Sequence, residues 1–204
     1  PSDTFRVADP DAPGGHRIVF EGAGQLFSRD GPVIDFQELH PSDGFSHYPI
    51  LGAYFPEGID ESEIVGPYDD TAPTLEPASR TILLRADTGE PIPHYAELDD
   101  SNGSEGRQLF AIRPLDRLDN GTRYIVALQN LSGADGEPLA APAGFRSLRD
   151  GTTGPAPIEA LRDRFESDVF APLDGFGVAR EDLVLAWDFT TQSFDVVAGD
   201  MLRV

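Results

Sequence analysis

The stretch LFAIRPLDRLDNGTRYIVALQN, residues 109–130, decides the fold class of this chain. Its first part, Leu109–Arg113, is a short apolar run, and Tyr124–Leu128 is a second one that is rich in strand-forming residues. Between them, Asn120-Gly121 is a strong signal for a tight turn. The stretch therefore predicts a β-hairpin in which the two apolar runs pair with each other.

Tyr124 opens the second predicted strand, three residues after Gly121. A tyrosine in this place is typical of the tyrosine corner of immunoglobulin-like sandwiches, where the hydroxyl group hydrogen-bonds back to the preceding bend. The alternative is an ordinary hairpin with an exposed tyrosine. We expect structural roles for Tyr124 and for Gly121 as the turn glycine.

Composition favours a folded, β-rich chain. Of the 204 residues, 39% are hydrophobic and 9% are aromatic, which is too many for a disordered chain. The 21 glycines and 18 prolines favour many turns and short strands over a helical bundle. No run approaches the ~18 apolar residues of a membrane-spanning helix. No signal peptide is visible, and the polar opening fits either a mature N-terminus after signal removal or a fragment boundary.

The charge excludes whole classes of partner. All 15 basic residues are arginines, and against 36 acidic residues they leave a net charge of −21. Such a surface repels nucleic-acid phosphates and disfavours anionic membranes. It is compatible with high salt, divalent cations or a basic partner, and the plainer interpretation is that it maintains solubility. The absence of cysteine excludes disulfides and thiol catalysis.

Pattern changes along the chain predict three parts. Residues 1–16 form an extended N-terminal segment, residues 17–150 form a β-sandwich domain, and residues 151–204 supply a linker, a helix and a strand that lead toward a further C-terminal domain. In the sandwich we predict strands at 17–20, 50–55, 80–85 and 91–98, the last two paired through the turn at 87–90, an edge strand at 142–148 and a helical turn at 59–64.

Beyond the linker at 151–157, the residues Ile158–Phe170 predict an amphipathic helix with one apolar stripe. Pro172 is expected to end this helix. The residues Leu183–Thr190 predict a strand, and the tail 191–204 follows neither pattern. The predicted fold class is mainly β, an immunoglobulin-like β-sandwich with one amphipathic helix and a further C-terminal strand.

Motifs for catalysis and cofactors are missing from the sequence. It has no G-x-S-x-G elbow and no glycine-rich phosphate loop. Ser46 and His47 are adjacent, but neighbouring side chains usually point apart, which disfavours a catalytic dyad. The four histidines (His16, His40, His47 and His94) lack metal-site spacing, and a hydrogen-bonding role suits His94 better than ligation. We therefore predict no catalytic and no cofactor-binding residue.

Two weaker predictions concern a calcium site and the single tryptophan. Loop carboxylates near glycine and serine can bind calcium, and the candidates are Asp99, Asp100, Asp135 and Glu137, although none fits the EF-hand pattern and a solvated acidic surface is the alternative. Trp187 is the single tryptophan. On a strand it is expected to be a structural core residue, with stacking on a substrate as the alternative.

Four motifs in order carry a resemblance: DGFS (43–46), TGEPIPHYAELD (88–99), IRPLDRLDNGTRYIVAL (112–128) and LVLAWDFTT (183–191). Together they resemble the N-terminal region of large secreted bacterial lipase- or esterase-like proteins, which carry an immunoglobulin-like segment before an α/β-hydrolase domain. The likeness spans nearly the whole chain. The predicted hairpin alone is also similar to immunoglobulin-like repeats of bacterial adhesins.

The resemblance implies an exported, extracellular or cell-surface protein that belongs to a larger polypeptide or assembly. In such proteins the nucleophile lies beyond the segment that matches LVLAWDFTT, so no catalytic residue is carried over to this chain. We expect a non-catalytic accessory domain that packs on, or positions substrate for, a C-terminal hydrolase-like domain outside the chain. An extracellular structural, adhesin-like or filament-forming module and a calcium-stabilised binding domain are the alternatives.

Overall fold

The structure is a computed structural model that describes residues 1–12, 14–21, 25, 27–34, 42–56, 58–99 and 109–201. The chain divides into two compact units. The first contains residues Pro1–His47, Leu118–Arg123 and Phe189–Val204, and the second contains Tyr48–Arg117 and Tyr124–Asp188. Each unit is therefore built from segments that are distant in sequence.

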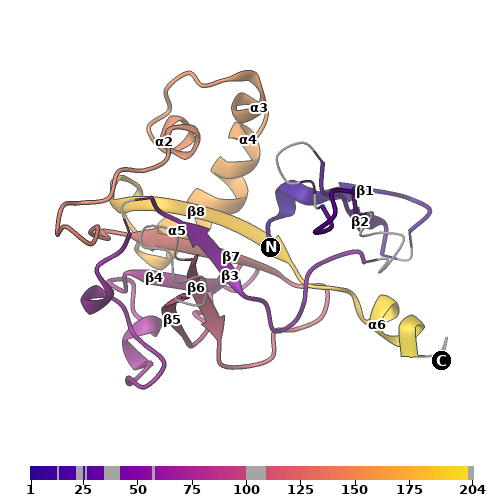
Figure 1. The fold of residues 1–204 in the computed structure, drawn as a ribbon, viewed down its shortest axis with the longest axis horizontal. Helices are drawn as coiled ribbons and strands as arrows, with labels where there is room; N and C mark the ends of the chain where they lie inside the picture. The colour runs from indigo at the N-terminus through magenta and orange to yellow at the C-terminus, as the bar shows by residue number, and fades with distance from the viewer. Residues whose placement is uncertain are drawn as a thin grey trace. The chain divides into compact units, whose positions relative to one another are not determined.

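Strands form the framework of the described residues (Figure 1). Their bounds are β1 Arg6–Ala8, β2 His16–Ile18, β3 Leu51–Tyr54, β4 Thr81–Arg85, β5 His94–Asp99, β6 Leu109–Pro114, β7 Arg123–Gln129 and β8 Leu183–Thr190. β1 and β2 form a two-stranded sheet in the first unit. Two three-stranded sheets, ordered β3-β6-β5 and β4-β7-β8, form the framework of the second unit. The protein is thus mainly β, as the sequence predicts.

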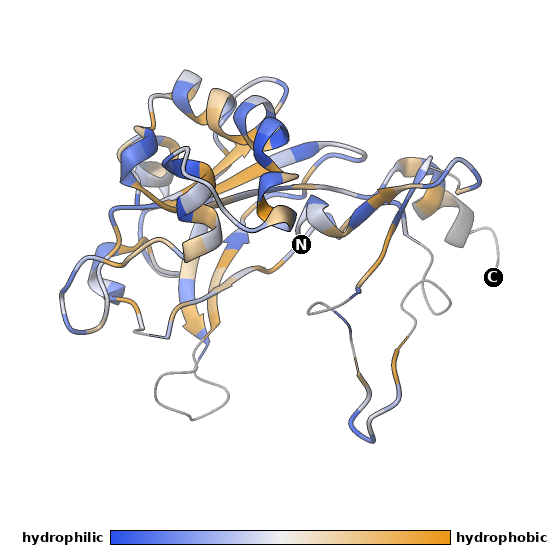
Figure 2. Ribbon diagram, turned by 90° about the horizontal axis from the view of Figure 1, so that it is seen from above, coloured by the Kyte–Doolittle hydropathy of each residue, from blue (hydrophilic) through white to orange (hydrophobic). Residues whose placement is uncertain are grey.

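Helical segments are short. They are η1 Asp3–Phe5, η3 Glu61–Glu63, η4 Ala72–Leu75, α2 Ala143–Arg149, α3 Ala156–Glu159, α4 Arg162–Phe165, η5 Glu166–Phe170, α5 Ala171–Phe176, η6 Arg180–Asp182 and α6 Phe194–Met201. The segments α2 to α5 cover one side of the β4-β7-β8 sheet (Figure 1). Figure 2 shows hydrophobic residues along the central strands, whereas the helical segments carry hydrophilic and hydrophobic residues side by side.

β4 is buried on both faces, which explains its nearly unbroken apolar sequence. Ile82 and Leu84 belong to a cluster with the apolar side chains of α2, α4, η5 and α5. Thr81 lies on the opposite face, where its hydroxyl is 2.9 Å from Nε2 of His94 in β5. The second unit therefore has helices on one side of this sheet and the β3-β6-β5 sheet on the other.

The predicted hairpin over 109–130 is wrong in its pairing. β6 pairs with β3 and β5, whereas β7 pairs with β4 and β8. Both strands are central in their sheets, and except for Leu109 at the start of β6 their aliphatic and aromatic residues are almost fully buried. Residues 115–122 between them are far more than a two-residue turn requires, so the chain crosses from one sheet to the other.

The second predicted hairpin, between 80–85 and 91–98, also differs from the structure in its strand pairing. β4 pairs with β7, and β5 pairs with β6. Backbone pairing between the two segments is limited to the residues next to the turn, where Ile92 N–H donates to the carbonyl of Leu83 at 2.8 Å. Prolines at 91 and 93 remove two donors that a continuing ladder needs, so the pairing stops there.

Helical structure differs from the prediction in two places. Residues 142–148 do not form an edge strand, because Ala143–Arg149 is helix α2, whose Phe145 and Leu148 lie three residues apart and face the core. The helix predicted over Ile158–Phe170 is interrupted after α3 and runs on through Pro172 to Phe176.

A π-helical turn explains why Pro172 does not end the helix. In η5 the N–H of Ala171 donates to the carbonyl of Glu166, five residues back. Since the hydrogen-bond register has already shifted at this point, the next residue is tolerated without an N–H. The helix ends at Gly177, which has a φ of +100° and allows Val178 N–H to reach the carbonyl of Leu173.

Other predicted elements are confirmed. β8 has the predicted bounds, β4 and β3 lie within their predicted ranges, and η3 supplies the helical turn within 59–64. The domain limits stay predictions, although β8, beyond residue 150, joins β4 and β7 in one sheet. No helix in the described part of the chain is long and apolar enough to cross a membrane.

Candidate functional site

The segment Thr190–Ser193, which we call the 190–193 junction, makes hydrogen bonds to several other segments of the first unit. At its start, Thr190 binds both oxygens of the Asp3 carboxylate. The backbone N–H donates to Oδ1 at 2.8 Å and the hydroxyl donates to Oδ2 at 2.5 Å. A two-point hydrogen bond to a carboxylate fixes orientation as well as distance. Asp3 thereby anchors η1 to the end of β8.

The DGFS motif lies alongside the junction and is joined to it by an isolated parallel β-bridge between Phe45 and Thr191. Phe45 N–H donates to the carbonyl of Thr190, and Gln192 N–H donates to the carbonyl of Phe45, both at 2.8 Å. At the next residue, Ser193 N–H donates to Oδ1 of Asp43 at 3.0 Å. Asp43 is 3% exposed, so its carboxylate serves this internal contact. Two motifs almost 150 residues apart thus meet in one unit.

Gly44 allows this close approach. A Cβ atom at this position would lie 2.4 Å from the carbonyl oxygen of Thr191 and 2.8 Å from the backbone nitrogen of Gln192. Both atoms belong to the backbone and cannot rotate away. The glycine of the DGFS motif is therefore explained by packing against the junction.

The turn at Gly121 covers the other side of the junction. Thr191 N–H donates to the carbonyl of Thr122, and Thr122 N–H donates to the hydroxyl of Thr191, both at 3.0 Å. Gly121 N–H donates to the carbonyl of Gln192 at 2.9 Å. Gly121 has a φ of +57°, as its predicted role as turn glycine requires. The turn does not close a hairpin but holds the 190–193 junction.

Ser46 and His47 line a cavity of about 280 Å³ in the same unit. Its remaining lining residues are Ile18, Phe20, Ser42, Gly44, Phe45 and Gln192. His47 is 9% exposed, and its Nε2 lies 3.1 Å from the carbonyl oxygen of Gln192. Ser46 is exposed. The His47 ring therefore contacts the junction, and the expectation that Ser46 and His47 form no catalytic dyad stays a prediction.

His94 has the structural role that was predicted for it. The ring is fully buried, with Nδ1 2.8 Å from the carbonyl oxygen of Ile92 and Nε2 2.9 Å from the hydroxyl of Thr81. Since a carbonyl only accepts, Nδ1 carries the proton and Nε2 accepts from the threonine. Burial lowers the pKa of His94, because the charged imidazolium would lose its hydration.

The remaining structural candidates lie in β7 and β8. Tyr124 is 2% exposed, which excludes the alternative of an exposed tyrosine. Trp187 is half-buried, and within the described residues its indole Nε1 is buried without a hydrogen-bond acceptor. The tyrosine corner and substrate stacking both stay predictions.

The calcium candidates are dispersed. Asp99 ends β5, and Asp100 lies outside the described residues. Asp135 accepts from the N–H of Glu137 at 3.1 Å, a local turn contact between two exposed residues. Among the residues that the structure describes, no three histidine or acidic side chains are grouped so that they could hold a metal ion.

One buried ion pair was missed by the sequence analysis. The Asp188 side chain is 2% exposed, and Nη2 of Arg164 in α4 donates to its Oδ1. The pair fastens α4 to β8 inside the second unit. Helical periodicity places Arg164 on the polar side of its predicted helix, so only the fold reveals that a buried carboxylate faces it.

Arg180 lines a second cavity of about 280 Å³ beside η5. Its guanidinium lies 4.0 Å from the ring centre of Phe170 and donates to both oxygens of Glu166, at 2.7 and 2.6 Å. It also donates to the carbonyls of Leu148 and Arg149. The hydrogen bonds from Arg180 to its carboxylate lower the pKa of Glu166. Together with the bonds to the two carbonyls, they connect three helical segments, so Arg180 has a structural role.

No protein-family model, curated protein or solved structure matches this chain.

Proposed function

We propose that this chain is a non-catalytic accessory module of an exported bacterial hydrolase-like protein, with an immunoglobulin-like sandwich as its framework. Its role would be to pack on, or position substrate for, a hydrolase domain outside these residues. The observation that carries the proposal is the 190–193 junction. There the DGFS motif meets the end of the LVLAWDFTT motif, with Phe45 N–H donating to the carbonyl of Thr190, and Asp43 and His47 contact the next residues, Ser193 and Gln192.

Strand order supports the sandwich. Constant-type immunoglobulin domains pair strands B, E and D in one sheet and C, F and G in the other. The orders β3-β6-β5 and β4-β7-β8 follow the same sequence of strands, and Tyr124 opens the strand that corresponds to F. Two departures are the helical segments α2 to α5 before β8 and the position of Trp187 on the last strand instead of strand C.

The junction supports a positioning role because it orients the chain as it leaves β8. Backbone and side-chain bonds from three separate segments, 3, 42–47 and 119–122, converge on four consecutive residues. Such bonds restrict the direction of the residues that follow. A connector between modules needs this property more than it needs a reactive side chain.

The experiment is a chromogenic acyl-ester assay with the wild-type chain and with Ser46→Ala. We expect no hydrolysis above buffer for either protein. The matched control is Ser167→Ala, a serine in η5 remote in sequence from both motifs. Turnover that Ser46→Ala abolishes and Ser167→Ala preserves would overturn the non-catalytic role.

The alternative functions have their own tests. A filament-forming or adhesin-like surface module predicts assemblies in size-exclusion chromatography and electron microscopy, and a strict monomer at high concentration contradicts it. A calcium-stabilised domain predicts a Tm that rises with calcium and falls with chelator. An unchanged Tm in both conditions eliminates it.

A further inference from the structure

The cavity that Arg180 lines beside η5 has apolar walls and charged groups at its exposed side. Its walls are side chains of the core cluster under the helices, namely Phe170, Leu173, Val178 and Leu183. Its charged groups are Glu166, Asp174 and Arg180. All of these residues lie in the second unit. A concave site with an apolar lining and a few charged groups is the usual form of a small-molecule site.

The charges of Glu166 and Arg180 balance each other. Both carboxylate oxygens of Glu166 accept from the guanidinium, at 2.7 and 2.6 Å. The other hydrogen bonds of Arg180 go to the carbonyls of Leu148 and Arg149. Since two negative groups and one positive group line the cavity, the negative charge of Asp174 is left without compensation.

Asp174 lies where a carboxylate is unfavourable. In the part of the chain that the structure describes, its side chain makes no hydrogen bond and no ion pair. The helix continues without a break from α4 through η5 to Phe176, so Asp174 lies in its last turn. The C-terminal end of a helix carries a partial negative charge and favours cations. A cation bound beside Asp174 therefore removes an unfavourable interaction.

The π-helical turn η5 forms part of the same wall. Its first residue, Glu166, and its last residue, Phe170, both line the cavity. π-Helical turns are rare, and they occur frequently at functional sites. The turn is therefore a second observation, independent of charge, that indicates a binding site at this place.

The charged groups decide which class of ligand fits. An anion is repelled by Asp174, and the guanidinium of Arg180 is already bound to Glu166. A metal ion such as calcium needs several oxygen ligands, whereas among the described lining residues only the carboxylate of Asp174 is unpaired. An organic cation fits both the apolar walls and the remaining charge.

We propose that this cavity binds a small organic cation that consists of an ammonium group on a compact apolar body. The ammonium group donates hydrogen bonds to the carboxylate of Asp174, and the apolar body packs against Phe170, Leu173 and Val178. The volume of about 280 Å³ limits the size of the ligand. Since a cavity of about 150 Å³ holds benzene, this one holds a molecule of about ten non-hydrogen atoms.

The site uses no residue of the 190–193 junction and does not depend on the accessory role proposed above. The ligand titration and the ester assay therefore fail independently of each other.

The test is a titration of the isotopically labelled chain, followed by heteronuclear NMR, with benzylammonium chloride as the probe. Benzyl alcohol has the same apolar body without the charge, and phenylacetate carries the opposite charge. Sodium chloride keeps the ionic strength constant, because a chain with a net charge of −21 attracts any cation weakly. The same spectra verify that each protein variant is folded.

Two matched variants separate specific binding from general attraction to an acidic surface. Asp174→Asn removes the charge and keeps the shape of the side chain. Its control is Asp163→Asn, which changes the net charge equally at an exposed carboxylate of α4 outside the cavity lining. A third variant, Ala171→Leu, places a larger side chain at the exposed side of the cavity and should exclude the ligand.

We expect benzylammonium to cause saturable shifts of amide signals within residues 166–183, benzyl alcohol to bind more weakly and phenylacetate not to bind. Asp174→Asn should raise the Kd about threefold, as for the loss of a partly exposed charge pair, and Asp163→Asn should leave it unchanged. The proposal is overturned if benzyl alcohol binds as tightly as benzylammonium, if the two asparagine variants behave alike, or if the shifts do not saturate. Unchanged binding by Ala171→Leu would also overturn it.

Discussion

At the scale of single residues, Gly44 has a strict structural requirement, because the atoms that a Cβ would meet belong to the backbone. We predict that Gly44→Ala lowers the free energy of unfolding by about 1–3 kcal/mol, because the new methyl group forces the 190–193 junction away from the DGFS motif. Urea unfolding measures the change.

Gly175 supplies the matched control for this substitution. A Cβ atom there has nothing within 4 Å, and the residue lies in α5. Gly175→Ala should therefore stabilise the protein by about 0.5–1 kcal/mol through helix propensity. Equal effects of the two substitutions would contradict the proposed close approach at Gly44.

Tyr124 tests the tyrosine corner. The ring is buried, so Tyr124→Phe keeps its packing and removes only the hydroxyl. We predict a loss of about 1 kcal/mol in unfolding free energy, the typical net value of one hydrogen bond. Tyr68→Phe at an exposed site is the control, and an unchanged Tm in Tyr124→Phe would remove the tyrosine-corner interpretation.

His94 gives a prediction about pH. Its pKa is lowered by burial, so below the unfolded value of about 6.5 the unfolded chain binds a proton that the folded chain does not. The stability that the neutral ring contributes is present above about pH 6.5 and is lost as pH falls through that value.

The non-titrating variant His94→Asn isolates this contribution. Wild type should exceed the variant in unfolding free energy at neutral pH, and the difference should shrink as pH falls from about 7.5 to 5. Urea unfolding at each pH measures it. A difference that stays constant over this range would refute the assignment.

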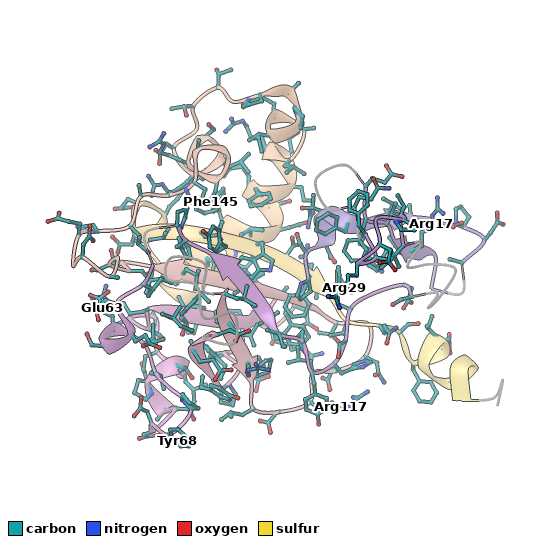
Figure 3. All side chains as sticks on the ribbon, viewed as in Figure 1. Arg17, Arg29, Glu63, Tyr68, Arg117 and Phe145 are labelled. Carbon is teal, nitrogen blue, oxygen red and sulfur yellow. The ribbon has the colours of Figure 1, made fainter. Side chains whose placement is uncertain are left out.

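At the scale of elements, an aromatic cluster holds the helices on the β4-β7-β8 sheet. Phe145 of α2 lies with its ring centre 6.5 Å from that of Phe165 and 6.0 Å from that of Phe170 (Figure 3). We predict that Phe145→Ala costs about 3–5 kcal/mol, because it leaves a cavity in a well-packed core.

Phe194→Ala is the control for this substitution, since Phe194 is 65% exposed. Its effect on the chemical unfolding midpoint should be small, within about 0.5 kcal/mol. If Phe145→Ala had as little effect, the helices would not depend on this cluster.

At the same scale, the elements show where periodicity succeeds and where it fails. β8 was predicted with its observed bounds, because strand formers persist over eight residues. Helix α2 was missed, because Pro142 and the apolar pair at 145 and 148 also fit an edge strand. Pro172 was taken as a helix end, since a π-helical turn has no recognisable sequence signal.

At the scale of the whole molecule, the net charge affects the stability of the folded state. With a net charge of −21, mutual repulsion of carboxylates opposes the compact state, and salt screens it. We predict that about 0.5 M sodium chloride raises the Tm by a few degrees, which corresponds to roughly 1 kcal/mol for a chain of this size.

Salt also weakens the attraction within ion pairs, which would lower the Tm. This effect is small, because exposed pairs such as Arg85–Asp87 contribute little to stability. Chloride is the suitable anion, because sulfate also stabilises proteins by preferential exclusion. Differential scanning calorimetry at several salt concentrations measures the response. A Tm that falls with salt would show that ion pairs outweigh repulsion.

The sequence by itself determined the mainly β class, the bounds of β8, the structural role of His94 and the placement of Gly121 in a turn. The bounds of β8 and the turn at Gly121 depend on neighbours within a few residues, where propensity and turn signals act, whereas the bond from His94 to Thr81 joins two strands. It also assigned the two apolar runs of 109–130 to strands, but it paired them with each other. Local patterns indicate that a segment is a strand, but they do not indicate with which strand it pairs.

Only the tertiary structure decided the partners. β6 lies between β3 and β5, and β7 lies between β4 and β8, so the two strands that are adjacent in sequence belong to different sheets. The 190–193 junction needs Asp3 and Asp43, which are 187 and 150 residues away from the groups they bind, and no local signal spans such distances. Whether a residue is buried depends on residues throughout the chain. The tertiary fold therefore determined the strand pairings that the sequence pattern left open.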